Sequence, residues 1–197
     1  MGGSPGRERL EAARQALAAA EQAAAGGVPE QVREDREPEP ENVARQIVLR
    51  QLAAGPRTRA QLRQRLDRRG CDPDVAERVL DRMTQVGLVD DAAYARMFVH
   101  SKQETKGLAA RAISHELREK GVDQELIDAA LEDVDTEVEK EQARALVAKR
   151  VRQVHGLDRE VQTRRLAGFL ARKGYGPGVA YDVIREALDA APEHQRD

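Results

Sequence analysis

Residues 113–131, ISHELREKGVDQELIDAAL, carry the pattern on which the fold prediction rests. Ile113 and Leu117 stand four residues apart, as on one face of a helix, and a second apolar stripe follows Gly121. A glycine after a basic residue such as Lys120 is typical of a helix C-terminus, because glycine adopts the left-handed conformation and a cation is favoured there. The stretch therefore predicts two helices joined by a tight turn.

The same pattern occurs twice more in the chain. LRQRLDRRGCDPDVAERVL spans residues 62–80, and LAGFLARKGYGPGVAYDVI spans residues 166–184. The matching positions are a leucine, a glycine, the residue after it and two later apolar residues: Leu66, Leu117, Leu170; Gly70, Gly121, Gly174; Cys71, Val122, Tyr175; Val75, Leu126, Val179; Leu80, Leu131, Ile184. Repetition at an interval of about 50 residues is typical of helical repeat proteins.

A further apolar stripe precedes each of these stretches, at Tyr94, Met97 and Phe98 in the middle repeat. Each repeat is therefore expected to contain three helices. We predict an all-α fold of three tandem three-helix repeats, at residues 41–90, 91–134 and 135–190. Because a unit of this size buries little by itself, the units are expected to stack into an elongated, curved array.

The two ends of the chain have a different composition. Residues 1–40 combine glycine, proline and charged residues, a composition that buries too little apolar surface to offset the entropy of ordering. We predict a disordered, acidic N-terminal tail at residues 1–40 and a short C-terminal tail at residues 191–197.

Composition supports the all-α prediction and limits the function. Aromatic residues make up only 3% of the chain, whereas β-rich cores usually draw on aromatic and β-branched side chains. The net charge of −2 does not by itself predict nucleic-acid binding. Its distribution is uneven: the three predicted repeats carry +3, −3 and +2 in chain order. Two basic units thus flank an acidic one, which could orient a charged, repetitive partner.

No catalytic constellation is found in the sequence. The single cysteine, Cys71, excludes an internal disulfide and is expected to be buried. The four histidines are scattered and lack metal-ligand spacing, so we predict no metal site, no cofactor and no enzymatic activity. Gly174–Gly178 resembles a phosphate-binding loop, but it follows a predicted helix and contains a proline, which favours a helix-linking turn. Without an apolar run or a signal peptide, a cytoplasmic location is expected.

Residues 88–121, LVDDAAYARMFVHSKQETKGLAARAISHELREKG, contain an ordered set of residues that resembles the central repeat of RecX regulators. The residues that carry the resemblance are Leu88, Asp90, Asp91, Tyr94, Ala95, Phe98, Lys106, Gly107, Ile113, Glu116, Leu117, Lys120 and Gly121. The other two repeats fit the flanking repeats of that family, so the resemblance covers about residues 41–190. The family often has proline and a basic residue after Lys-Gly, where this chain has Leu108 and Ala109.

The resemblance implies a function as well as a fold. A RecX-type protein is expected to bind RecA filaments on single-stranded DNA, to lie in the filament groove, and to suppress ATP turnover, strand exchange and repressor cleavage. We expect a monomer with no membrane partner. The basic side chains of the middle repeat are the candidate contacts with the filament: Lys102, Lys106, Arg111, Arg118 and Lys120.

Basic side chains in the flanking repeats are candidates for contacts with the filament or with DNA phosphates. They are Arg65, Arg68, Lys149, Arg150, Arg152, Arg164 and Arg165. A solvated charged face is an equally good interpretation of this pattern. No aromatic residue alternates with these cations, so the pattern does not favour a protein that stacks on bases.

The alternative function is that of a helix-turn-helix DNA-binding protein that acts without RecA. In that interpretation residues 72–86 form the recognition helix, followed by a short strand at Leu88 and Val89. The helix would present four acidic residues, Asp72, Asp74, Glu77 and Asp81, which suits a DNA major groove badly.

Overall fold

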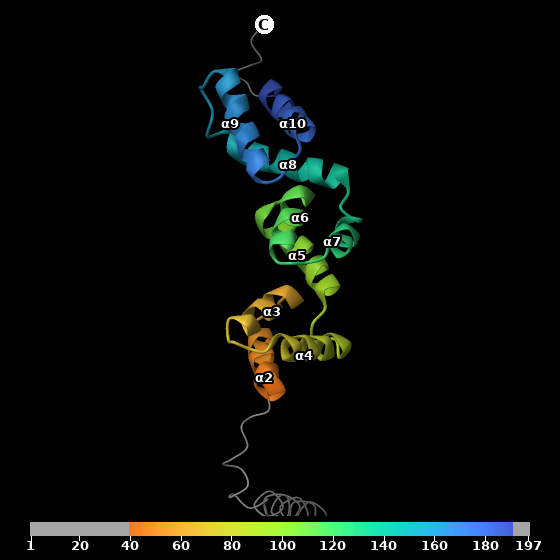
Figure 1. The fold of residues 1–197 in the computed structure, drawn as a ribbon. Coiled ribbons are helices and arrows are strands. Elements are labelled where there is room, and N and C mark those ends of the chain that lie inside the picture. Colours follow the sequence, from red (N-terminus) through yellow and green to blue (C-terminus); the bar gives the residue numbers. More distant parts are fainter. Residues whose placement is uncertain (1–39, 191–197) are drawn as a thin grey trace, which may run out of the picture. The chain divides into compact units, whose positions relative to one another are not determined.

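A computed structural model describes residues 40–190 of the chain, and in that part the chain forms nine helices and no strand (Figure 1). The all-α prediction is therefore confirmed. The predicted tails, residues 1–40 and 191–197, lie outside the described residues except for Pro40.

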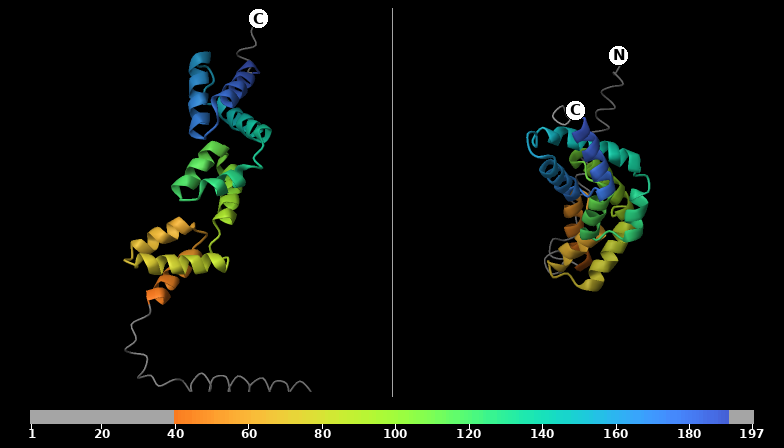
Figure 2. Two further views of the ribbon diagram at one scale, coloured as in Figure 1. Left: turned by 45° about the vertical axis from the view of Figure 1, so that its right-hand side comes forward. Right: turned by 90° about the horizontal axis from the view of Figure 1, so that it is seen from above.

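The helices group into three units in chain order, as the left view of Figure 2 shows. The first unit comprises α2 (Pro40–Ala53), α3 (Arg59–Asp67) and α4 (Pro73–Gln85). The middle unit comprises α5 (Asp91–Lys106), α6 (Ala110–Glu119) and α7 (Gln124–Leu131). The third unit comprises α8 (Thr136–Val151), α9 (Arg159–Arg172) and α10 (Pro177–Asp189). The most extensive packing between helices lies within these units, as predicted for three-helix repeats.

Each unit has its own apolar core, and the repeated positions occupy corresponding places in it. Leu66, Leu117 and Leu170 are all fully buried on the second helix of their unit. On the first helices, three alanines and three valines are buried in the same order: Ala44, Ala95, Ala143 and Val48, Val99, Val147. These buried residues fix the register in which positions of the three units are compared below.

Two expectations about individual residues need correction. Cys71 is half-buried rather than buried, although the corresponding Val122 and Tyr175 are both 4% exposed. The hydroxyl of Tyr175 donates to the Gly107 carbonyl of the preceding unit at 3.3 Å, whereas Cys71 belongs to the first of the units in residues 40–190. Met97, assigned to the apolar stripe of the middle repeat, is 44% exposed. The buried face of its helix is formed by Ala95, Phe98 and Val99 instead.

The repeated glycine has a second role, at the junctions between units. Gly121 and Gly174 both have positive φ, +74° and +90°, as expected after a helix. A Cβ at Gly121 would lie 2.3 Å from the Cβ of Ala60, and a Cβ at Gly174 would lie 2.6 Å from the backbone nitrogen of Ala112. The same atom at Gly70 would meet nothing within 4 Å. Because Gly121 and Gly174 have no side chain, the second helix of the preceding unit can pack closely against them.

Hydrogen bonds repeat at the two junctions as well. Asp91 of α5 accepts from the backbone N–H of Arg59, the first residue of α3, at 2.9 Å. Glu139 of α8 accepts in the same way from the N–H of Ala110, the first residue of α6. The first N–H groups of a helix have no partner within it, so the middle and third units each cap the second helix of the unit before them.

One further hydrogen bond crosses each junction in the other direction. The hydroxyl of Thr58 donates to the Lys120 carbonyl at 2.6 Å, and the N–H of Ala109 donates to the Lys173 carbonyl at 2.9 Å. Ala109 also belongs to the apolar core of the third unit, although it precedes α6. Neighbouring units therefore share backbone partners and, at the second junction, part of a core.

We expect Asp91→Ala to lower the free energy of unfolding by about 1 kcal/mol, because the Arg59 N–H then loses its acceptor. Asp91→Asn should cost less, since an amide oxygen can accept the same bond.

Burial raises the pKa of Asp91 above its ordinary value. The folded chain therefore binds this proton more tightly than the unfolded chain, and the contribution of Asp91 to stability falls as pH rises through the raised pKa. Urea denaturation of wild type and Asp91→Asn at acidic and neutral pH measures this.

The stability difference, wild type minus Asp91→Asn, is expected to decrease from acidic to neutral pH. A difference that stays constant or grows over this interval would contradict the assigned direction of the pKa shift.

Candidate functional site

Two pockets lined by basic side chains lie at corresponding places in the first and third units. The pocket of the first unit lies between α2 and α3 and is lined by Gln51, Arg57, Gln61, Leu62, Gln64, Arg65 and Arg68. The pocket of the third unit lies beside the end of α8 and α9 and is lined by Arg150, Gln153, Val154, Arg164, Arg165, Leu166, Gly168 and Arg172. Among these lining residues there is no carboxylate. We call them the first-unit and third-unit pockets.

The two pockets share corresponding positions. Gln51 and Arg150 each stand three residues after the buried valine of the first helix. Arg68 and Arg172 each stand six residues after a buried leucine of the second helix. The pockets therefore come from the same cleft between first and second helices, with arginine in the last turn of the second helix or directly after it.

Several of these arginines have no anionic partner. The Nε of Arg65 is buried and has no hydrogen-bond partner in the described part of the chain. In the third-unit pocket, the guanidinium of Arg150 lies 5.1 Å from the centre of the Phe169 ring. Arg164, Arg165 and Arg172 form no ion pair within residues 40–190. Unpaired guanidinium groups in a shared pocket can bind a phosphate or carboxylate through charge-assisted hydrogen bonds.

The middle unit differs at the same place. Lys102 corresponds to Gln51 and Arg150, but its ammonium forms an ion pair with Glu116 at 2.6 Å. The two side chains are only 18% and 31% exposed. Lys102 also lies 4.7 Å from the centre of the Phe98 ring, which holds it against the core. The place that contains no carboxylate in the flanking pockets is therefore occupied by a carboxylate, Glu116, in the middle unit.

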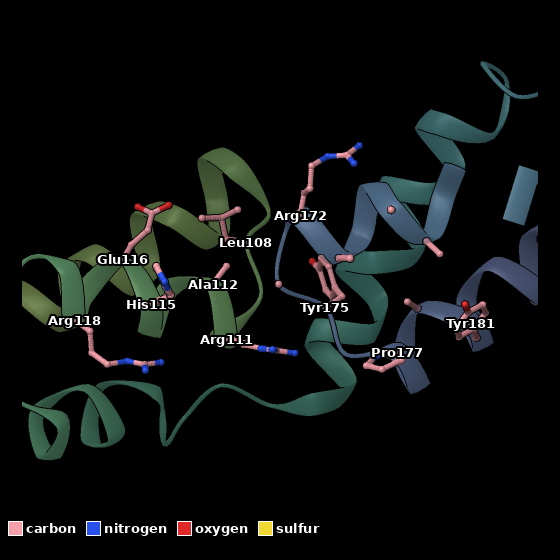
Figure 3. Close-up of a pocket in the computed structure, with 15 residues that line it drawn as sticks. Leu108, Arg111, Ala112, His115, Glu116, Arg118, Arg172, Tyr175, Pro177 and Tyr181 are labelled. Atoms are coloured by element: carbon pink, nitrogen blue, oxygen red, sulfur yellow. The ribbon is translucent and has the colours of Figure 1, made fainter. Parts of the chain in front are cut away.

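A larger groove lies between α6 and the third unit, and Figure 3 shows it in close-up. Its apolar lining consists mostly of small residues: Leu108, Ala112, Ala167, Ala171 and Ala180. Arg111 and Arg118 lie along the lower edge in this view and Arg172 at the upper edge. Tyr175 lies between them, and burial raises the pKa of its hydroxyl to about 12, so it stays a neutral hydrogen-bond donor.

Family comparisons match all three units. The first three-helix domain of RecX matches residues 44–83, the second residues 90–131, and the third residues 137–188. The chain belongs to the RecX family. The resemblance seen in residues 88–121 is thereby confirmed.

Individual RecX proteins are similar over most of the chain. The regulatory protein RecX of Streptomyces coelicolor is 49% identical over 155 residues, which cover 79% of this chain and 82% of that protein. The regulatory protein RecX of Thermobifida fusca is 47% identical over 147 residues, or 75% of this chain and 80% of the relative. The chain is thus related to proteins named as regulators.

Solved structures agree on the fold. A crystal structure of a regulatory protein RecX aligns with a TM-score of 0.68 at 26% identity, covering 75% of this chain and 72% of that one. RecX from Lactobacillus salivarius aligns with a TM-score of 0.69 at 21% identity, covering 78% of this chain and 99% of the other.

The structure does not bring the five candidate filament contacts of the middle repeat together. Lys102 is paired with Glu116, and the ammonium of Lys120 lies 5.3 Å from the centre of the Phe98 ring. Arg111 and Arg118 are exposed at the groove of Figure 3. Lys106 is exposed at the end of α5, where its carbonyl accepts from the ammonium of Lys173.

In the flanking units, five candidate residues lie in the two pockets and two do not. The pocket residues are Arg65, Arg68, Arg150, Arg164 and Arg165. Lys149 and Arg152 are exposed and line neither pocket. Two pocket residues were not among the candidates from the sequence: Arg57, which precedes α3, and Arg172, the last residue of α9. Comparison of equivalent positions in repeats one and three would have found Arg172.

The recognition helix of the alternative function, α4, uses its acidic side chains within its own unit. Arg59 of α3 pairs with Glu77 and, at 2.7 Å, with Asp81, and Arg63 also pairs with Glu77. These pairs hold α3 and α4 together. The two arginines of α4, Arg78 and Arg82, are exposed, and Arg78 pairs with Glu41 of α2 at 2.7 Å. The short strand expected at Leu88 and Val89 is absent from the described residues.

The described residues contain no group of three or more metal-ligating side chains that could hold an ion. Within residues 40–190 no helix is both long enough and apolar enough to span a membrane.

Proposed function

We propose that this protein binds RecA filaments on single-stranded DNA and inhibits their recombinase, ATPase and coprotease activities. The observation that carries the proposal is the ordered match of all three units to the RecX domains, together with relatives named as regulatory proteins. A filament presents identical protomers at regular intervals. A chain of three joined units can therefore make several weak contacts that add through effective concentration. A cytoplasmic monomer fits this role.

The contacts with RecA are assigned to the exposed cations of the middle unit, Lys106, Arg111 and Arg118. They have no carboxylate partner in the described part of the chain, so an acidic protein surface can pair with them. Lys102 and Lys120 are also among the five candidate contacts of the middle repeat. Their contacts with the Phe98 ring leave their ammonium groups less available to a partner protein.

Inhibition of RecA ATPase on single-stranded DNA tests this assignment. The double reversal Lys106→Glu and Arg111→Glu is expected to raise the concentration for half-inhibition by roughly tenfold or more, because two attractive contacts become repulsive. Circular dichroism should show unchanged helicity. A matched reversal, Arg50→Glu and Arg96→Glu, changes the net charge equally at exposed positions elsewhere. Equal inhibition by both double variants would refute the assigned surface.

The contacts with DNA phosphates are assigned to the first-unit and third-unit pockets. Reversal of Arg150 and Arg165 to glutamate is expected to weaken binding to single-stranded DNA. It should also reduce the slope of log K against log salt by about 1.4, or 0.7 for each lost phosphate contact. Fluorescence anisotropy across a NaCl series measures both. An unchanged slope would remove the third-unit pocket from the interface.

The alternative, a DNA-binding protein that acts without RecA, is favoured by the same two pockets. The two functions differ in their preferred target. A RecA regulator should bind RecA-coated single-stranded DNA more tightly than the bare strand at the same salt concentration, whereas the alternative requires the reverse order.

A further inference from the structure

In the middle unit, the place that corresponds to the two flanking pockets contains its own anion, the carboxylate of Glu116. Position by position, Glu116 stands where the first unit has Arg65 and the third unit has Phe169. Its carboxylate accepts from the ammonium of Lys102 at 2.6 Å. A phosphate oxygen bound in a flanking pocket would accept from a cation in the same way. Glu116 thus places a carboxylate against Lys102, and it also lines the groove of Figure 3.

We propose that the middle unit contains a third, latent phosphate site that Glu116 keeps closed. The inference rests on the proposed phosphate contacts of the flanking pockets and assigns one further residue, which sets how many phosphates of a DNA strand the protein holds. With Glu116 in place, the chain contacts phosphates through its first and third units, and the middle unit binds none.

The cations of the latent site are held in place independently of Glu116. Lys102 and Lys120 both lie over the Phe98 ring, at 4.7 and 5.3 Å from its centre. Cation–π contact with a buried ring keeps these ammonium groups near their positions when the carboxylate is neutralised. Glu116→Gln therefore leaves these two cations over the Phe98 ring with no carboxylate paired with Lys102.

The test measures, by fluorescence anisotropy, the binding of the full chain to a single-stranded DNA oligonucleotide at a series of NaCl concentrations. Glu116→Gln is expected to steepen the dependence of log K on log salt by about 0.7 and to raise the affinity at low salt by roughly threefold to tenfold. Glu125→Gln, at an exposed position on α7, makes the same change in net charge and should produce neither effect. Thermal denaturation by circular dichroism confirms that each variant is folded.

Lys102 provides a second, independent readout. Lys102→Met is expected to leave DNA binding of the wild-type chain unchanged, because the ammonium is already neutralised by Glu116. In the Glu116→Gln background the same substitution should abolish the gain. Glu116→Arg, which copies the first unit, should also steepen the salt dependence and serves if Glu116→Gln is unstable.

The outcomes separate this inference from the proposed function. Equal effects of Glu116→Gln and Glu125→Gln, or a gain that survives Lys102→Met, would overturn the latent site. If the Arg150 and Arg165 reversal leaves the salt slope unchanged, the phosphate contact of the third-unit pocket fails, whatever Glu116→Gln does.

Discussion

Replacement of Gly174 by alanine is expected to lower the free energy of unfolding by about 2–5 kcal/mol, from left-handed backbone strain together with overpacking. The φ angle of +90° disfavours any side chain. In addition, the new Cβ would lie 2.6 Å from both the backbone nitrogen and the Cβ of Ala112 in the preceding unit. Backbone atoms at a helix start cannot move without breaking the junction, so the two costs add.

Gly70 provides the matched control for this substitution. Its φ of +71° is similarly left-handed, but no atom lies within 4 Å of an added Cβ. Gly70→Ala should therefore cost only the backbone term, about 1–2 kcal/mol. Urea denaturation of both variants measures the difference. Equal losses would mean that the close approach at Gly174 relaxes at no cost and that the junction is not tightly packed.

Truncation of Leu117 to alanine is expected to cost about 2–5 kcal/mol, the usual range for a buried leucine. Leu117 has no exposed surface and lies in the core of the middle unit with Phe98 and Ile113. Its removal leaves a cavity between helices that are also tied to both neighbouring units. Chemical denaturation followed by circular dichroism at helical wavelengths measures the loss.

The stability loss at Leu117 can be compared with the losses at two leucines that are less buried. Leu131 is only partly buried at the edge of the same core, so Leu131→Ala should cost less than Leu117→Ala. Leu88, at 51% exposed, should change stability by no more than about 0.5 kcal/mol. A loss at Leu117 as small as that at Leu88 would show that the assigned inward face of α6 is wrong.

The junctions give these substitutions effects beyond one unit. Asp91 and Glu139 each cap a helix of the preceding unit, and Ala109 of the middle unit is buried in the core of the third. Unfolding of one unit therefore leaves helix termini of its neighbour without partners. Units coupled in this way should unfold together rather than one at a time.

The sequence alone determined the fold class and the repeated organisation. Apolar residues at helical spacing and a glycine after each second helix are local signals, because side chains three and four residues apart share a face whatever lies around them. The ordered residues of the middle repeat, from Leu88 to Gly121, also indicated the family before the structure was known. Such signals do not depend on which helix packs against which.

Only the tertiary structure decided what each charged side chain does. Lys102 and Glu116 are 14 residues apart on different helices, and nothing in their spacing predicts the ion pair between them. Likewise, the close approach of Gly174 to Ala112 distinguishes it from Gly70, although both follow basic helix ends. The physical reason is that contacts between helices depend on how the helices cross and rotate. Periodicity along one helix fixes only which side faces inward.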